Sequence, residues 1–567
     1  MGLFDGPLAV PIGLTTTFLA ALLLLGMLQL AHIPHRNAIS SNKFTEVDQR
    51  SMVSLSKSTP LSVSMKTKYT ERDGYLGRHY VWSDGSFIAE PHLSTTFAVE
   101  EPQEEARYVW KLQSDGDDYI ELTGPHIKLK FRHLHKYSLT VKEYGNKDKA
   151  GKNALREQEW GINVKYVRRE VRQLFDEDVE IIFNALATLW KYDDAEGKKR
   201  FGERYVSMAT LQALHSALTG AAAAGEEGEV GAGGCDHLDA GPGALAQHGA
   251  LSLALEQALQ AVDPRASLPY WDYARDLWAW AGAPAPAYSG FQEEGERWPF
   301  FHGGHEPFTS AYFGSTDPAT GLIADGRWKQ LEGAVRPTLA CARAVALAQG
   351  AELQAGAVCT EFAGALGERA WSGFAAALSE HRYYQQLTEG MAGAEEEAAC
   401  RVPGVRATGT ASSPEFWAVA PAVERLFHFK QSFLPFQDGA WPEAAAHEAD
   451  RDEAAAEGGQ RRRGRRLGAQ AQAQEQAAAT GGASSEDGVE VWDRPLAGEK
   501  ELAFCSGHNP GDTVLEGRLE IFYNGEYMRP TVAQMLHILD PQNANLPYLY
   551  DSFDFSYCDN FGVSIPM

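Results

Sequence analysis

The chain has 567 residues, of which 44% are hydrophobic and 11% aromatic, as in a globular protein with room for two or three domains. Its formal net charge at pH 7 is −25. A chain this acidic repels phosphate backbones, which argues against a general nucleic-acid-binding protein.

Residues 8–31 form an apolar run without a charged side chain, long enough to cross a bilayer as a helix. We therefore expect residues 1–44 to be a signal peptide or a membrane anchor. Arg36 and Lys43 follow the run and Asp5 precedes it, so the positive-inside tendency would leave the rest of the chain in the cytosol. Signal recognition depends mostly on the apolar core, which favours a protein that is secreted or anchored in the secretory pathway.

Apolar and polar residues alternate strictly in two runs within the segment 60–146. Ile127, Leu129 and Phe131 alternate with basic residues, and a second run alternates in the same way at Tyr137, Leu139 and Val141. A period of two is typical of half-buried strands. The pattern predicts a small all-β domain over 60–146, best described as a β-sandwich of immunoglobulin type.

The spacing of apolar residues becomes helical after residue 176, and three acidic residues at 176–178 suit a helix start. Residues 219–234 are Ala, Gly and Glu and are typical of a flexible insertion. Four stripes at helical spacing predict a helical bundle over 160–435 with a site in its core. The stripes are Val179, Ile182, Phe183, Leu186 and Trp190; Met208, Leu211, His215 and Leu218; His248, Leu251, Leu255, Leu259 and Val262; and Phe374, Leu378, His381 and Gln385.

Residues 442–490 are rich in Ala, Gly, Glu and Gln and predict a disordered linker. An arginine cluster at 461–466 inside it is compatible with a solvated linker, a dibasic processing site or a nuclear signal. The tail 500–567 contains an Asn524-Gly525 turn signal and an aromatic run, which predict a small C-terminal cap. The expected fold class is thus α+β and multidomain.

The six cysteines are compatible with three disulfides in an exported chain, and fifteen pairings are open. One of these, between Cys505 and Cys558, would pin the C-terminal cap. No two cysteines are spaced as Cys-x-x-Cys, which argues against a thiolate zinc site.

Residues 267–273 read Ser-Leu-Pro-Tyr-Trp-Asp-Tyr and follow the helix that carries His248. This arrangement resembles the first copper half-site of the tyrosinase, catechol oxidase and haemocyanin family, the type-3 copper proteins. The resemblance implies His215 and His248 as ligands. Asp239 stands where the family has its remaining histidine, and His237 lies two residues away, so either would complete the half-site.

The resemblance continues in the second half-site and covers roughly residues 160–435. His381 matches a ligand of the family's His-x-x-x-His helix, and Gln385 replaces the second histidine. Residues 414–425 resemble the family's Pro-x-Phe-Trp-x-x-His segment, with Ala420 at the ligand position. Alanine cannot bind a metal.

Several neighbouring residues are expected to be structural. Trp271 and Trp417 should pack in the core. Asp272 should accept hydrogen bonds that fix a loop or a helix end, and Glu424 and Arg425 should form an ion pair with each other.

Two hypotheses of function follow. The resemblance implies a type-3 copper oxidoreductase that oxidises phenols or diphenols with O₂ at two coppers. The substituted ligands favour instead a binding or structural protein that kept the fold and binds at most one metal, through His215, His237 or Asp239, and His248. An oxygen carrier of haemocyanin type would need the same two coppers. The sequence indicates neither the substrate nor the oligomeric state.

Overall fold

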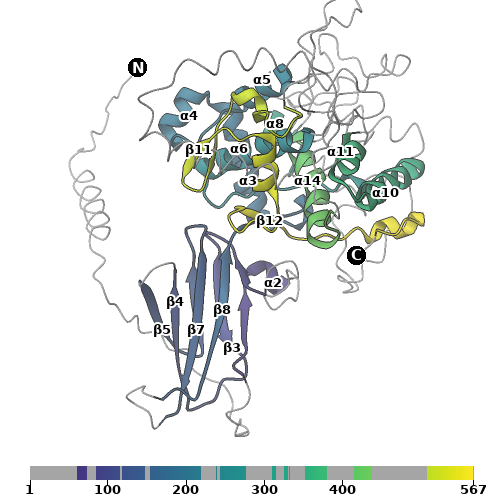
Figure 1. Ribbon diagram of the computed structural model, residues 1–567. Helices are drawn as coiled ribbons and strands as arrows, with labels where there is room; N and C mark the ends of the chain where they lie inside the picture. Colours follow the sequence, from purple (N-terminus) through teal and green to yellow (C-terminus); the bar gives the residue numbers. More distant parts are fainter. Residues whose placement is uncertain are drawn as a thin grey trace, which may run out of the picture.

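The computed structural model describes residues 60–72, 85–114, 118–146, 153–218, 238, 243–275, 310–314, 325–329, 331, 351–379, 414–436 and 507–565. It is an α+β protein, with an all-β part followed by a mainly helical part (Figure 1). None of the described helices combines the length and the apolarity needed to cross a membrane. The predicted anchor at 1–44 and the predicted linker at 442–490 lie outside the described residues.

Two sheets build the all-β part. One has the order β1-β3-β6 and is antiparallel, and the other has the order β2-β8-β7-β4-β5, in which only β2 and β8 run parallel. Their strands are β1 (Val63–Lys66), β2 (Phe87–Ala89), β3 (Ser94–Val99), β4 (Arg107–Gln113), β5 (Tyr119–Thr123), β6 (His126–Lys130), β7 (Lys136–Tyr144) and β8 (Arg156–Val164). A short helix, α2 (Lys68–Arg72), follows β1.

The inner faces of the two sheets share one apolar core. In the register, Trp110 of β4 lies opposite Val141 of β7, and Phe97 of β3 lies opposite Ile127 of β6. All four are buried in the same cluster, which confirms the predicted strand periodicity. β8 carries the five-stranded sheet to Val164, past the predicted end at 146, because its Ile162 and Val164 complete this core.

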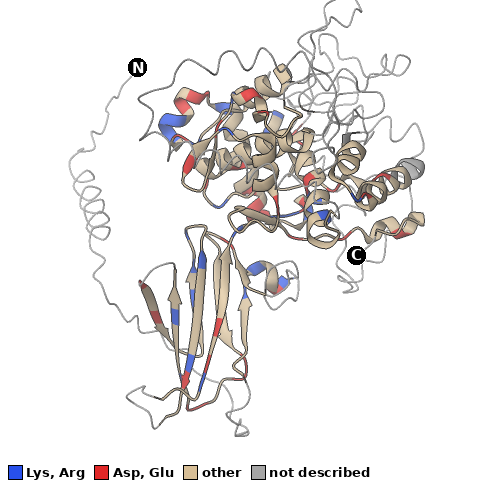
Figure 2. Ribbon diagram, viewed as in Figure 1, with Lys and Arg blue, Asp and Glu red and all other residues tan. Residues whose placement is uncertain are grey.

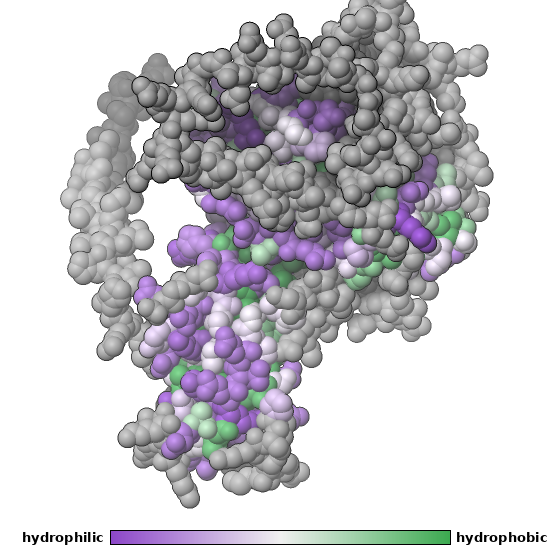
Figure 3. Space-filling view, viewed as in Figure 1, coloured by the Kyte–Doolittle hydropathy of each residue, from purple (hydrophilic) through white to green (hydrophobic). Residues whose placement is uncertain are grey.

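The outer faces of the strands carry the charge. Acidic and basic side chains are interspersed along the strands (Figure 2). The face of this part seen in Figure 3 is mainly hydrophilic, with single apolar side chains between the polar ones. This is the surface expected of strands that alternate inward and outward residues.

The helical part is organised around α6 (Ala244–Val262), which is buried along most of its length. A helix that is apolar or small on all sides belongs in the interior. Around it lie α3 (Asp176–Lys191), α4 (Asp194–Phe201), α5 (Met208–Leu218), α8 (Gly326–Lys329), α10 (Ala351–Gly367), α11 (Trp371–Ser379) and α14 (Phe416–Phe433). α3 begins at the predicted Asp176 and buries Ile182, Phe183 and Leu186.

The C-terminal tail is built into the helical part. β12 (Tyr548–Tyr550) pairs in parallel with β9 (Tyr166–Arg168), and the tail shares the core of the helices (Figure 1). α16 (Val532–Leu539) packs so closely on α6 that a Cβ at Gly249 would lie 2.3 Å from Leu539 Cδ1. The remaining elements are η1 (Val171–Gln173), η4 (Val514–Gly517), β10 (Ile521–Tyr523), β11 (Glu526–Met528) and η5 (Ser556–Phe561).

Two local predictions for the tail have different outcomes. The Asn524-Gly525 turn joins β10 and β11, with φ of 51° and 91° at its two residues, as the hairpin signal predicts. The predicted pairing of Cys505 with Cys558 is wrong, because Cys558 is bonded to Cys359. Contacts between η5 and α10 bring these two cysteines together, with Cα atoms 5.4 Å apart.

Candidate metal centre

Three elements of the helical core position the candidate metal ligands. α5 carries His215 and α6 carries His248, while α14 contributes Phe416 and Ala420. His248 falls on the same helical face as Leu251 and Leu255, so the packing that buries those residues also draws its imidazole inward.

His215 and His248 lie close together in the interior. Their exposed fractions are 1% and 5%, and their ring centroids are 6.2 Å apart with an angle of 55° between the planes. The ring of Phe416 stands edge-on to His215 at 4.8 Å. Two predicted ligands from different helices are thus brought together in apolar surroundings.

The 6.2 Å between the two ring centroids is of the size that a metal ion shared by both rings requires. Two metal–nitrogen bonds of about 2 Å, together with the half-widths of two imidazole rings, span about 6 Å. Imidazole nitrogen suits copper in both of its common oxidation states.

The start of α14 packs beside His215, but its residue 420 is not a metal ligand. Ala420 is buried in this helix and presents only a methyl group. The N–H of Trp271 donates to the carbonyl of Ala418 over 2.9 Å, which fastens the Pro-Tyr-Trp-Asp segment to α14. Trp271 and Trp417 are both buried, so their predicted role in core packing is confirmed.

The other predicted ligands, His237, Asp239 and His381, lie outside the described residues, as does Gln385. Within the part of the chain that the structure describes, no group of three or more His, Cys, Asp or Glu side chains could hold a metal ion. The described site therefore consists of the His215–His248 pair.

A buried cluster of charges ties α6, α14 and the tail together. Arg168 at the end of β9 donates to Glu256 of α6 over 2.8 and 3.1 Å and to Glu424 of α14 over 3.2 Å. Its guanidinium also lies 3.3 Å from the ring centroid of Tyr548 and donates to the hydroxyl of Tyr550. Three segments far apart in the sequence meet at this one side chain.

Glu256 also holds the segment that carries the family resemblance. It accepts hydrogen bonds from the N–H of Leu268 over 2.9 Å and from the hydroxyl of Ser267 over 3.3 Å. Glu256 lies eight residues after His248 on α6, so the same helix positions the candidate ligand and anchors the Leu-Pro-Tyr-Trp-Asp turn.

Glu424 faces the positive charge of Arg168 in this cluster. Burial opposes its ionisation, but the charge of Arg168, the contact with His428 and a hydrogen bond from the hydroxyl of Tyr548 outweigh burial and lower the pKa of the carboxyl. His428 lies one turn further along α14, with its Nε2 3.3 Å from Glu424 Oε1. Its ring stacks on Tyr548 at a centroid distance of 5.8 Å.

The predicted ion pair between Glu424 and Arg425 is wrong. Successive helical residues point in different directions, so Glu424 faces Arg168 while Arg425 faces Asp272 at 3.3 Å. Arg425 also donates to the carbonyls of Ser552 and Asp554 in the tail over 2.5 and 3.0 Å.

Asp272 has the role expected of it. Its carboxylate accepts a hydrogen bond from the hydroxyl of Tyr557 over 3.1 Å as well as from Arg425. It therefore fixes the Pro-Tyr-Trp-Asp turn between α14 and the end of the chain, and the prediction that it holds a loop is confirmed.

Reasoning from the sequence missed Arg168, Glu256 and His428. The signal for Arg168 is its place in an Arg-Arg-Glu run at the end of the short, mainly apolar stretch 162–167. Glu256 and His428 are polar residues inside apolar helical stretches, which marks them as candidates for buried, paired groups. None of these signals indicates which residue each of the three would pair with in the fold.

Comparison of the sequence with models of known protein families and with curated proteins finds no match to either.

Proposed function

We propose that this chain is a copper protein of the tyrosinase type, with His215 and His248 as ligands of one copper. The observation that carries the proposal is the pair of buried imidazoles from α5 and α6, 6.2 Å apart between ring centroids. Support also comes from the adjacent Pro-Tyr-Trp-Asp turn, which Glu256 and Ala418 hold in place.

Bound copper would supply redox chemistry toward O₂ and phenols or diphenols, the family activity that the sequence resemblance implies. The chain's own residues would orient the ligands and exclude water. Phe416 packs against His215, and the buried helix α6 fixes the direction of His248. Six ligands for two coppers would require donors from residues outside the described part. Among these, His237 or Asp239 would complete the first half-site and His381 would contribute to the second.

The same proposal covers the wider architecture and location. The all-β part would be a sandwich-like domain of immunoglobulin type, followed by the tyrosinase-like bundle. The chain would be secreted or anchored in the secretory pathway, with a small phenol and O₂ as its molecular partners. The uncharged run at residues 8–31 motivates that location.

A second function is favoured by Ala420. A buried alanine at the proposed ligand position gives that position no donor for a second copper. The protein would then bind one metal ion or none and act as a binding or structural protein on the same scaffold.

Copper content tests the proposal. We expect the purified chain, reconstituted with copper, to retain at least one copper, and His215→Gln or His248→Gln to lose it. His126→Gln, at an exposed histidine of β6, is the matched control and should retain copper. The electron paramagnetic resonance spectrum of Cu(II) in the wild type should show coupling to imidazole nitrogen, and this coupling should diminish in the two site variants.

The number of coppers separates the two functions. Two coppers per chain with oxidation of a diphenol would support the oxidoreductase, and one copper without oxidation would support the binding protein. No copper uptake, or equal uptake by the wild type and both site variants, would contradict the proposed site. Far-UV circular dichroism of each variant shows that lost copper does not reflect an unfolded chain.

A further inference from the structure

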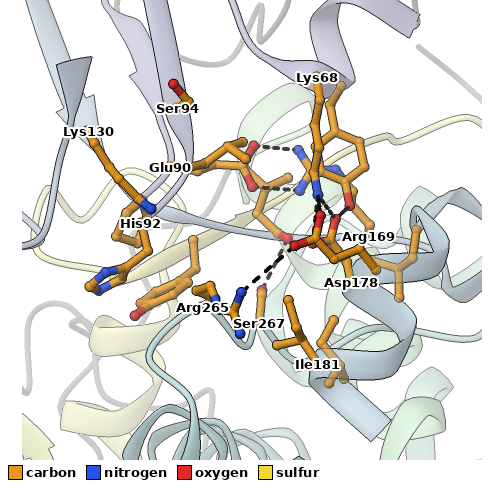
Figure 4. A pocket seen from close by; sticks show the side chains of 18 residues that line it. Lys68, Glu90, His92, Ser94, Lys130, Arg169, Asp178, Ile181, Arg265 and Ser267 are labelled. Carbon is orange, nitrogen blue, oxygen red and sulfur yellow. Dashed lines mark hydrogen bonds and ion pairs between the residues drawn. The ribbon is translucent and has the colours of Figure 1, made fainter. Parts of the chain in front are cut away.

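A cavity of about 240 Å³ lies where the all-β part meets the helical part. The all-β part contributes His92 and Lys130 to its wall, and the helical part contributes Ile181, Arg265 and Ser267 (Figure 4). The candidate copper ligands are not among its lining residues. The cavity is therefore a separate place for a ligand, formed by both parts of the chain.

Most acidic groups of the wall already have cationic partners. Glu90 receives two hydrogen bonds from Arg169, over 2.6 and 2.7 Å, and Asp178 receives one from Lys68 over 2.8 Å (Figure 4). Within each pair, the positive charge neutralises the negative one. Each pair also joins the all-β part to the helical part at the wall of the cavity.

Lys130 carries a positive charge on the wall opposite these pairs. Among the described residues, no carboxylate lies within ion-pair distance of its ammonium group. Figure 4 shows the side chain extending from β6 toward His92. Arg265 faces the cavity from the loop after α6, where Asp263 holds its guanidinium at 2.7 Å.

His92 is held in place and lies in a positive field. Its backbone is left-handed, with φ of 62°, and its N–H donates to the carbonyl of Phe131 over 2.7 Å. Burial and the neighbouring charges of Lys130 and Arg132 lower the pKa of its imidazole. An anion in the cavity would relieve this repulsion.

The rest of the wall is apolar. Leu174, Ile181 and Ile182 line it from the helical part, together with the aromatic ring of Tyr166. The hydroxyl of Tyr166 donates to the carbonyl of Pro264 over 2.8 Å, so the part of Tyr166 that is left to contact a ligand is its apolar ring. A cavity of this size suits a ligand of about one ring rather than a drug-sized molecule.

We propose that this cavity binds a small organic carboxylate with an apolar body, such as an aromatic carboxylate. Lys130 and His92 would bind the carboxylate, and Tyr166 and Ile181 would contact the apolar body. Three observations support this assignment. Lys130 and His92 lie on one wall, the acidic groups opposite are already paired, and most of the remaining lining residues are apolar. Binding would join the two parts of the chain, since the lining residues come from both.

Calorimetric titration of the full-length, metal-free chain with benzoate tests the proposal. We expect Lys130→Gln to weaken benzoate binding about fivefold, as expected for a partly exposed charge pair. Lys128→Gln is the matched control, because Lys128 lies two residues away on β6, is exposed and does not line the cavity. His92→Asn should also weaken binding, and asparagine tolerates the left-handed backbone.

Two further probes test the chemical class. Benzamide, which has the same ring without the charge, should not bind measurably, and acetate, which lacks the ring, should bind more weakly than benzoate. Hydrogen exchange should show that benzoate protects residues 91–94 and 177–182. The proposal is overturned if benzoate does not bind, if benzamide binds as well, or if Lys130→Gln and Lys128→Gln weaken binding equally.

Discussion

Arg168 carries a full charge although its exposed fraction is zero. A buried ion costs several kcal/mol of desolvation unless partners compensate for it. Here two carboxylates, a tyrosine hydroxyl and an aromatic face surround the guanidinium. The arrangement makes Arg168 a contact that α6, α14 and β12 share.

Replacing Arg168 by methionine should lower the free energy of unfolding by about 3–5 kcal/mol, because Glu256 and Glu424 would stay buried without their cation. Denaturant unfolding measures the loss. Arg200→Met is the control, since the Arg200–Glu196 pair on α4 is half exposed, and its removal should cost no more than about 0.5 kcal/mol.

A triple variant distinguishes charge from packing at this site. Arg168→Met combined with Glu256→Gln and Glu424→Gln removes every charge of the cluster, so part of the lost stability should return. If the single and triple variants are equally unstable, the loss comes from packing and the electrostatic explanation is wrong.

At the scale of elements, the end of the chain is held by one covalent and several polar contacts. η5 is bonded to α10 through Cys558 and Cys359, which are 199 residues apart in the sequence. Arg425 of α14 binds the carbonyls of Ser552 and Asp554 just before η5. The tail is therefore attached to both α10 and α14.

Cys359→Ser should lower the free energy of unfolding by about 3–5 kcal/mol, because the disulfide closes a long loop. Cys558→Ser and the double variant should show the same loss, since each breaks the same bond. Losses that add in the double variant would mean that the two cysteines stabilise the fold independently, contrary to the disulfide.

At the scale of the whole molecule, the all-β part and the helical part are joined by partly buried charge pairs. Arg169 follows β9 and binds both carboxylate oxygens of Glu90, which follows β2. The guanidinium also lies 3.4 Å from the ring centroid of Tyr69 in α2. A bidentate pair of this kind fixes orientation as well as distance.

Arg169→Met should therefore lower stability by about 2 kcal/mol and separate the unfolding of the two parts into two calorimetric transitions. Lys142→Met is the control, because Lys142 pairs with Glu157 at an exposed position within one sheet. A single transition with an unchanged midpoint in Arg169→Met would show that other contacts hold the two parts together.

The sequence by itself determined the local structure. Ile127 and Val141 lie on inward strand faces, and His215 and His248 lie on inward helix faces, because periods of two and about 3.6 residues follow from backbone geometry alone. The start of α3 and the hairpin at Asn524 have equally local causes.

Only the tertiary structure decided the partners. Arg168 meets Glu256 and Glu424 across 88 and 256 residues, and Cys359 meets Cys558 across 199. The ion pair predicted between the neighbours Glu424 and Arg425 failed for the same reason. Which charges and thiols meet depends on how whole elements pack, and a single sequence carries no periodic signal for contacts between distant segments.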